Sequence, residues 1–204
     1  MPLNQEQQAV ANAILTSNTP ITIIQGKAGT GKSYLVKSII PQLGRVQIIC
    51  PTNLAKQVYP YASTMHSFFY GEFDDLDEGY QNPSSYNFVR SGQWFLPRIN
   101  SVDTFVFDEI SMVRADTFEM MNKICQVARN SSKPFGGIRV IAVGDMMQLP
   151  PIVEEEEVYK YRTVYLCHRN FMFLYKEVKE LWFTQDEESG PGYSWWNRYF
   201  RIYA

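Results

Sequence analysis

Residues 26–33 read GKAGTGKS, and this stretch constrains the fold more than any other part of the 204-residue chain. It follows the short apolar run ITIIQ (21–25), which is typical of a buried strand. After it, apolar side chains recur at helical spacing until Gly44, at Leu35, Val36, Ile39, Ile40 and Leu43. The stretch matches the pattern G-x-x-x-x-G-K-[ST] at every required place, between a strand and a helix. The sequence therefore predicts a strand–loop–helix unit that holds the phosphates of a nucleotide, and the flanking elements disfavour a chance glycine turn.

Each residue type in this loop suits contact with a polyphosphate. Glycines adopt backbone angles that let successive N–H groups point at phosphate oxygens, and the following helix adds the positive end of its dipole. Lys32 is expected to reach the β- and γ-phosphates, and the Ser33 hydroxyl is expected to ligate Mg²⁺. The predicted nucleotide-binding residues of the loop are Gly26, Ala28, Gly29, Thr30, Gly31, Lys32 and Ser33.

An acidic pair can supply a metal ligand and a general base, which the glycine loop does not contain. Asp108 and Glu109 directly follow the apolar run TFVF, which is predicted to be a buried strand. One carboxylate can hold a magnesium ion while a second deprotonates an attacking water, so Asp108 is assigned to the metal and Glu109 to the base. The alternative is a helix N-terminus that favours negative charge, which would explain one of the two carboxylates.

Apolar strands and amphipathic helices alternate along the chain. Besides residues 21–25, the predicted strands are Val46 to Cys50, Thr104 to Phe107 and Ile138 to Val143. The first helix is expected to begin after Asn4 as N-cap, with Gln7 at its third position. A later helix carries Phe118, Met121, Cys125 and Ala128 on one face. This alternation predicts an α/β domain of three layers with a mostly parallel sheet, in which ligands bind at the carboxyl ends of the strands.

Composition and charge restrict the class of protein. The net charge of −2 gives no strong basic field of the kind that indicates a large nucleic-acid surface. Cys50, Cys125 and Cys167 are far apart and the chain has only two histidines, so a structural zinc site is not expected and the thiols suit a reducing interior. The polar start MPLNQEQQ does not resemble a signal peptide, and no apolar run reaches spanning length. An intracellular protein without a membrane partner is therefore predicted.

Further strings in the sequence carry a specific resemblance. In chain order they are LNQEQ, GKAGTGKS, CPTNLAKQ, STMHSFF, VFDEISMV and PFGGIRVIAVGDMMQLPPI. Their order and spacing resemble those of the superfamily 1B DNA helicases, with the PIF-type branch closer than the phage Dda and RecD enzymes. The resemblance covers residues 3 to about 152. It implies a RecA-like P-loop domain that binds and hydrolyses ATP with Mg²⁺ and couples this reaction to single-stranded DNA.

The resemblance also implies roles for two glutamines. Gln7 matches the family residue that reads the adenine edge, although its place in a capping box explains it equally well. Gln148, in GDMMQLPP, matches the residue that senses the γ-phosphate and links the ATP state to the grip on DNA. The alternative for Gln148 is a hydrogen bond within its own loop, and Asp145 is expected to support the same loop. The predicted catalytic residues are then Lys32, Asp108, Glu109 and Gln148.

Five residues match family positions that touch the backbone of single-stranded DNA: Thr52, Asn53, Thr64, His66 and Ser67. Small hydroxyls and helix N-termini suit phosphate contacts without base selectivity. Each position has a structural alternative, because Thr52 and Asn53 form a good N-cap pair and a lone histidine is more often structural. The expected partner is single-stranded DNA or a junction between a single strand and a duplex.

The segments outside the strand–helix alternation are assigned from the resemblance. Residues 1–152 are predicted to form the motor domain, with an insertion at 68–98 where the family carries a wedge that splits the duplex. Aromatic residues of the insertion either stack on bases or anchor it to the core; they are Tyr86, Phe88, Trp94 and Phe95. Residues 153–204 are predicted to be an aromatic-rich extension that covers a sheet edge, docks a partner or packs on the core.

The family's second RecA-like domain supplies an arginine finger and half of the DNA track. The roughly fifty residues after Pro151 are too few for such a domain, so we expect it, or a protein partner, to act in trans. Arg169, in VYLCHR, resembles the strand-then-arginine motif at the family's hinge.

The predicted function is the motor domain of an ATP-dependent 5'-to-3' DNA helicase, with the polarity implied by the resemblance alone. Slow hydrolysis and little unwinding are expected of this chain by itself, because arginine fingers contribute orders of magnitude to hydrolysis. An alternative from another class is a nucleotide-dependent regulator or adaptor that binds DNA or protein without unwinding. A second alternative is a small P-loop kinase, which the string around Gln148 and the lack of an evident acceptor lid disfavour.

Overall fold

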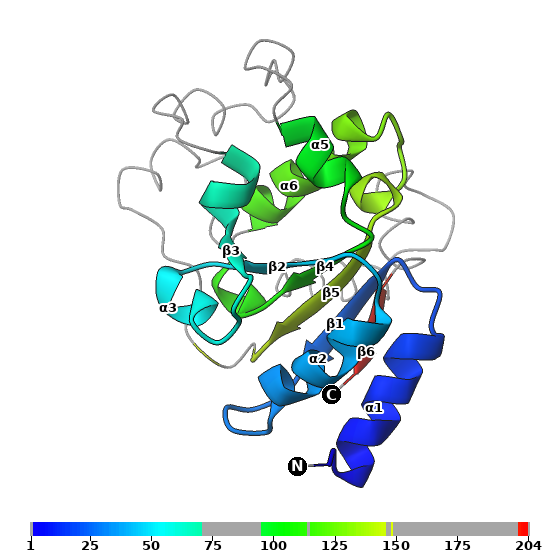
Figure 1. The fold of residues 1–204 in the computed structure, drawn as a ribbon, viewed down its shortest axis with the longest axis vertical. Coiled ribbons are helices and arrows are strands. Elements are labelled where there is room, and N and C mark those ends of the chain that lie inside the picture. Colours follow the sequence, from blue (N-terminus) through cyan, green and yellow to red (C-terminus); the bar gives the residue numbers. More distant parts are fainter. Residues whose placement is uncertain (1, 71–94, 114, 146–147, 149–199, 204) are drawn as a thin grey trace, which may run out of the picture.

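The computed structural model describes residues 2–70, 95–113, 115–145, 148 and 200–203 (Figure 1). The strands are β1 (Ile21–Gln25), β2 (Val46–Cys50), β3 (Ser63–Thr64), β4 (Thr104–Phe107), β5 (Arg139–Gly144) and β6 (Phe200–Tyr203). The α-helices are α1 (Gln5–Thr16), α2 (Lys32–Ile39), α3 (Asn53–Lys56), α5 (Phe95–Asn100) and α6 (Ala115–Ala128). Short 3₁₀- or π-helical turns are η1 (Ile40–Gln42), η2 (His66–Tyr70), η3 (Ile110–Met112) and η4 (Pro134–Gly137). The predicted alternation of strands and helices is confirmed.

The six described strands form one sheet in the order β3-β2-β4-β5-β1-β6. Every neighbouring pair of these strands is parallel. Strand β5 therefore lies between β1, which leads into the glycine loop, and β4, which leads into the acidic pair. Because all carboxyl ends of a parallel sheet meet at one edge, this order brings the loop and the acids to the same edge.

Helices cover both faces of the sheet and make three layers, with α1 and α2 on one face and α5 and α6 on the other (Figure 1). Alternate residues of a strand point to opposite faces. In β4, Phe105 and Phe107 therefore join the core on the α5–α6 side, while Val106 joins the core on the α1–α2 side. The α5–α6 side is rich in aromatic rings, and Phe105 lies 5.6 Å from the ring centroids of both Phe68 and Phe69. The predicted three-layer α/β fold with a parallel sheet is confirmed.

Two helix boundaries follow from named residues. The Asn4 side chain accepts a hydrogen bond from the Gln7 backbone nitrogen at 2.7 Å, and the Gln7 side chain accepts one from the Asn4 backbone at 3.1 Å. The capping box predicted at the start of α1 is therefore present. Helix α2 ends at Ile39, earlier than the apolar spacing indicates, and the chain continues as η1, which contains Pro41. Proline has no backbone N–H and its ring disfavours a continued α-helix, which explains the early end.

Two findings concern the segments that were predicted from the resemblance. Phe68 and Phe69, the first residues of the expected insertion at 68–98, are buried in the core at 4% and 3% exposure. Residues 200–203, within the expected aromatic extension, form β6 beside β1. Residues 71–94 and 149–199 lie outside the described residues, and with them lie the proposed stacking aromatics Tyr86, Phe88 and Trp94.

The cysteines that the structure describes, Cys50 and Cys125, are free thiols and are buried. Burial, with smaller contributions from Asp108 and Glu109, raises the pKa of Cys50 to about 12. This agrees with the prediction that these thiols act as small buried apolar groups, whereas Cys167 and Arg169 lie outside the described residues. Within the described ranges, no helix is long and apolar enough to cross a membrane.

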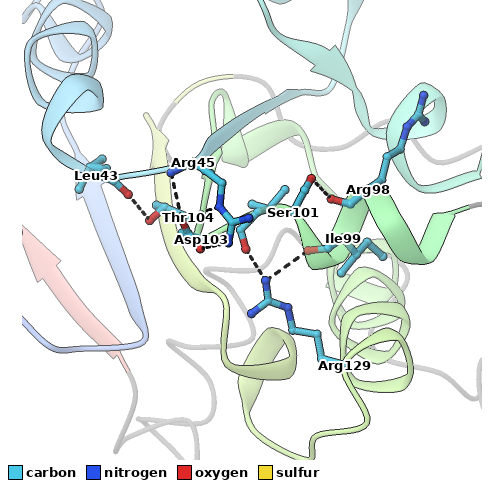
Figure 2. Close-up of polar contacts among 9 residues, drawn as sticks. Leu43, Arg45, Arg98, Ile99, Ser101, Asp103, Thr104 and Arg129 are labelled. Atoms are coloured by element: carbon cyan, nitrogen blue, oxygen red, sulfur yellow. Dashed lines mark hydrogen bonds and ion pairs between the residues drawn. The ribbon is translucent and has the colours of Figure 1, made fainter.

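A set of polar contacts joins the amino ends of β2 and β4 (Figure 2). The Arg45 guanidinium donates two hydrogen bonds to the Asp103 carboxylate, at 3.0 and 2.8 Å, and the Arg45 backbone nitrogen donates a third at 3.1 Å. Arg129, the residue directly after α6, donates to the carbonyl oxygens of Ile99, at 3.3 Å, and of Val102. These contacts tie the loop before β4 to β2 and to α6, at the end of the sheet opposite the candidate site.

Candidate active site

The loop at residues 26–31 connects the carboxyl end of β1 to the first turn of α2. Gly29 and Gly31 have φ angles of +79° and +83°, which residues other than glycine rarely adopt. The Gly26 backbone nitrogen donates to the carbonyl oxygen of Gly144, the last residue of β5, at 3.2 Å. The Lys32 ammonium group donates to the carbonyl oxygens of Gly26, at 2.7 Å, and of Lys27, at 3.0 Å. The loop therefore curls around a positive charge at the amino end of an eight-residue helix.

Gln7 links α1 to this loop. Its amide nitrogen donates to the carbonyl oxygen of Thr30 at 3.0 Å, while its amide oxygen remains in the capping box with Asn4. A Cβ atom at Gly31 would lie 2.6 Å from the Gln7 amide nitrogen, so the glutamine packs directly on the loop. The geometry is therefore compatible with both interpretations of Gln7, the cap and the contact with a base.

Asp108 and Glu109 follow the carboxyl end of β4. Asp108 is 4% exposed, and its Oδ1 atom accepts a hydrogen bond from the Glu109 backbone nitrogen at 3.0 Å. Glu109 has φ 53° and ψ 45°, a left-handed conformation that is uncommon outside glycine and is found at functional sites. The loop that leads to Lys32 follows β1 and the acidic pair follows β4, and these two strands lie on either side of β5.

Burial is the main cause that raises the pKa of both carboxyls above their usual range. The Asp108 carboxylate raises the pKa of Glu109 further, and the Lys32 ammonium group lowers the pKa of both. The structure therefore brings Lys32 within electrostatic reach of the two acids. A metal cation at this place would add to the effect of Lys32, because positive charge favours the ionised carboxylate.

Asp145 connects the glycine loop to Gln148. It follows β5 directly and is 6% exposed. Its Oδ2 atom accepts hydrogen bonds from the Ala28 backbone nitrogen at 3.1 Å and from the Gln148 amide nitrogen at 3.2 Å. The Gln148 backbone nitrogen also donates to the Asp145 carbonyl oxygen at 3.0 Å. One carboxylate thus supports both segments, and its contact with Gln148 is the one expected for Asp145 from the sequence.

The side chains at this edge fit a hard, oxygen-ligated cation such as Mg²⁺. The Ser33 hydroxyl and the Asp108 carboxylate both offer oxygen atoms. Close to both lies the hydroxyl of Tyr59, which is buried and makes no hydrogen bond of normal geometry within the described part of the chain. Sequence reasoning did not identify Tyr59, because nothing in its local context distinguishes it from a core aromatic residue.

The predicted DNA-contact residues lie on another flank of the same edge. Thr52 is the N-cap of α3, and its hydroxyl accepts a hydrogen bond from the Ala55 backbone nitrogen at 3.2 Å, so the structural alternative for Thr52 is present. Thr64 and Ser67 cap one another, since the side chain of each accepts a hydrogen bond from the other's backbone nitrogen, at 3.1 and 3.2 Å. The exposed residues Asn53 and His66 lie beside these two turns.

The sheet order separates this flank from the glycine loop. Strands β4 and β5 lie between β2, which leads to Thr52, and β1, which leads to the loop. Sequence reasoning missed Arg98, an exposed residue of α5 that donates to the Ser67 carbonyl oxygen at 3.0 Å. Its guanidinium carbon lies 5.7 Å from the Phe68 ring centroid and brings positive charge to the turn at residues 64–67.

Comparison with known proteins places this geometry in a family. The model of the PIF1-like helicase family matches residues 2–185. The ATP-dependent DNA helicase PIF1 of Danio rerio is 32% identical over 161 residues, which cover 76% of this chain and 23% of that protein. The chain thus spans about a quarter of the length of this curated relative.

Solved structures of Pif1 helicases have the same fold. A Pif1 structure that concerns DNA unwinding at forked double-stranded DNA by two coordinating helicases matches with a TM-score of 0.68 and 28% identity, over 81% of this chain and 38% of that one. Bacteroides Pif1 in complex with ADP-AlF3 and single-stranded DNA matches with a TM-score of 0.67 and 26% identity, over 85% of this chain and 40% of that one. The sheet is thus that of a RecA-like helicase domain, and the chain belongs to the PIF1-like helicase family.

Proposed function

We propose that the chain is the ATP-hydrolysing motor domain of a 5'-to-3' DNA helicase. The observation that carries this proposal is the meeting of Lys32, Asp108 and Glu109 at one edge of the sheet. Family membership supports it, since the relatives are named ATP-dependent DNA helicases. The same membership argues against the small-kinase alternative.

The residues of the candidate site have separate roles in nucleotide binding and hydrolysis. Backbone N–H groups at Gly29 and at residues 31–33, together with the Lys32 ammonium group, hold the phosphates of ATP, and Gln7 contacts the base. Ser33 and Asp108 hold Mg²⁺, which supplies positive charge to the transferring phosphoryl group. Glu109 accepts a proton from the attacking water, a role for which a raised pKa is suitable because it strengthens the base.

We assign to Gln148 the role of reporting the state of the nucleotide. Its amide shares the Asp145 carboxylate with the Ala28 backbone of the loop. A change at the γ-phosphate therefore reaches the loop and Gln148 through one common anchor. From there it passes to the DNA-contact flank along the carboxyl edge of the sheet.

The DNA partner is single-stranded DNA or a junction. Thr52, Asn53, Thr64, His66 and Ser67 would contact the sugar–phosphate backbone, and the guanidinium of Arg98 adds a positive charge beside them. The single-stranded DNA in the Bacteroides Pif1 complex supports this assignment for the family. The protein is accordingly placed inside the cell, with nucleic acid.

The motor needs more than the described domain. We assign residues 1–152 to the motor domain, the segment 68–98 to an insertion that carries the wedge, and residues 153–204 to an extension. Because the chain spans 23% of the Danio rerio relative, we assign the arginine finger to a second RecA-like domain or to a partner in trans.

The test uses the whole chain in three assays: calorimetric binding of ADP with Mg²⁺, ATP hydrolysis with and without single-stranded DNA, and strand separation on a forked duplex. Nucleotide binding with slow, DNA-stimulated hydrolysis is the expected result, and Lys32→Ala should abolish both. ATP-dependent DNA binding without any hydrolysis would favour the regulator instead. Absence of magnesium–nucleotide binding by the unmodified chain would refute the proposal.

A further inference from the structure

Tyr59 carries a buried polar group that the roles above leave unused. The residue is 3% exposed, and its hydroxyl is shielded from solvent and makes no hydrogen bond of normal geometry with any described residue. Buried polar groups nearly always have a partner, because an unsatisfied one is costly. Inside a candidate ligand site, an unpaired buried hydroxyl indicates that its hydrogen bonds form when the ligand binds.

The ring of Tyr59 is anchored from several sides. Its backbone nitrogen donates to the Lys56 carbonyl oxygen at 3.0 Å, in the turn that follows α3. The ring belongs to the core on the α1–α2 side, which also contains Val36 and Cys50. The ammonium group of Lys37, on α2, lies 5.5 Å from the ring centroid. The position of the hydroxyl is therefore fixed by the fold.

The hydroxyl lies near the two residues assigned to the metal. Burial and the Asp108 carboxylate raise the pKa of Tyr59, and the Ser33 hydroxyl lies close enough to lower it in part. The effect is mutual, because Tyr59 lowers the pKa of Asp108. Asp108 follows β4, Ser33 lies in α2 and Tyr59 lies in the connection after α3, so these three groups meet only in the folded domain.

We propose that Tyr59 is a positioning residue of the magnesium–nucleotide site, an inference that rests on the proposed function. When Mg²⁺ and nucleotide bind, its hydroxyl accepts a hydrogen bond from Ser33 and donates one to the Asp108 carboxylate. This chain of hydrogen bonds turns the Ser33 oxygen and the Asp108 carboxylate toward the same cation.

The numbers of donors and acceptors fit this arrangement. A tyrosine hydroxyl has one donor and two acceptor lone pairs, so it can serve both neighbours at once. A serine oxygen that ligates a cation must point its proton elsewhere, and Tyr59 provides an acceptor for it. Asp108 uses its Oδ1 atom for the Glu109 backbone nitrogen and keeps acceptor capacity for Tyr59 and for the cation's shell.

The variant Tyr59→Phe tests this role, because it keeps the ring and removes only the hydroxyl. We expect its affinity for ADP in the presence of Mg²⁺ to fall about tenfold, the loss of one hydrogen bond to a charged group. Affinity for ADP in the presence of EDTA should stay within about twofold of the unmodified chain. The melting temperature of the metal-free protein should not fall, since the hydroxyl has no good partner in that state. Calorimetry and thermal melts measure these quantities.

The matched control is Tyr61→Phe, which removes a hydroxyl two positions along the same connection. Tyr61 is 88% exposed, and we expect this variant to bind magnesium–ADP like the unmodified chain. Ser33→Ala and the double variant with Tyr59→Phe complete a cycle in which the two losses should not add, because both residues belong to one chain of hydrogen bonds.

The outcomes separate the inference from the function on which it rests. If the unmodified chain shows no magnesium-dependent gain in ADP affinity, both fail. If it shows that gain and Tyr59→Phe keeps it in full, only the role of Tyr59 is refuted. A Tyr59→Phe protein that loses its cooperative melt also refutes the inference, because the hydroxyl would then serve the metal-free fold.

Discussion

The carboxylate of Asp145 accepts a hydrogen bond from the Ala28 backbone nitrogen at 3.1 Å, although 117 positions separate the two residues in the chain. The same oxygen atom accepts the Gln148 amide at 3.2 Å. A residue outside the glycine loop therefore holds one of the backbone N–H groups of the loop. This contact makes the loop and Gln148 parts of one hydrogen-bonded unit.

The first prediction concerns this unit. Asp145→Ala should lower the free energy of unfolding by about 1–3 kcal/mol, because it removes the hydrogen bonds that the Ala28 backbone and the Gln148 amide donate to a buried carboxylate. The affinity for ADP should fall with it, since the loop loses its support. Urea denaturation and calorimetry measure the two effects. Gln148→Ala serves as the comparison, because it removes one partner and leaves the Ala28 contact intact; equal ADP affinities for the Asp145 variant and the unmodified chain would contradict the prediction.

The second prediction concerns Glu109 as the base. Glu109→Gln should reduce ATP hydrolysis by about 10²- to 10⁴-fold, the usual contribution of general base catalysis, with ADP affinity little changed. Initial rates at saturating ATP and Mg²⁺ compare the variant with the unmodified chain. An unaltered rate in Glu109→Gln would assign the base elsewhere.

The third prediction concerns the turn before β5. A Cβ atom at Gly136 would lie 2.4 Å from the Cys125 carbonyl oxygen, and its φ of +63° is unfavourable for other residues. Gly136→Ala should therefore lower the free energy of unfolding by roughly 2–4 kcal/mol. Gly137→Ala is the matched control: its φ is +86°, but its Cβ would meet the nearest atom, in Lys133, at 3.7 Å, so it should cost only about 1 kcal/mol. Chemical denaturation compares the two, and equal losses would show that the close contact is relieved.

The fourth prediction concerns the exposed ion pair at the amino ends of β2 and β4. Hydrogen bonds from Arg45 lower the pKa of Asp103 to about 2 from 3.8. A carboxyl with a lower pKa in the folded state stabilises the fold above its unfolded pKa, and this contribution is lost as the pH falls from about 4 to about 2. Asp103→Asn should therefore remove part of the acid sensitivity of unfolding. Denaturation midpoints between these pH values test it, and identical acid profiles would contradict the assignment.

Strand and helix positions could be predicted where the cause is local. The apolar runs at residues 21–25, 46–50 and 104–107 became β1, β2 and β4 with the predicted bounds, and β5 is displaced by one residue. Strands β3 and β6 were not predicted. Their residues are strands because β2 and β1 offer free edges, which is a property of the folded sheet.

The residues of the candidate site also fall into those that could be predicted from the sequence and those that could not. Lys32, Asp108 and Glu109 could be predicted because each stands at a fixed offset from a strand, and parallel strands bring such offsets to one edge. Tyr59 and Arg98 could not, because their importance depends on contacts with residues that are distant in the chain. Gln7 makes contacts of both kinds: its capping-box contact with Asn4 is local in the chain, whereas its hydrogen bond to Thr30 joins distant residues.

The position of strand β6 affects how the domain folds during translation. It is the outer neighbour of β1, the strand that leads into the glycine loop. During translation, β1 emerges early, whereas the backbone that covers its open edge emerges only with residues 200–203. Until then β1 pairs with β5 on one side only, and other chains can add to its open edge. A ribosome stalled shortly before residue 200 would therefore hold a chain that is prone to aggregation along the edge of β1.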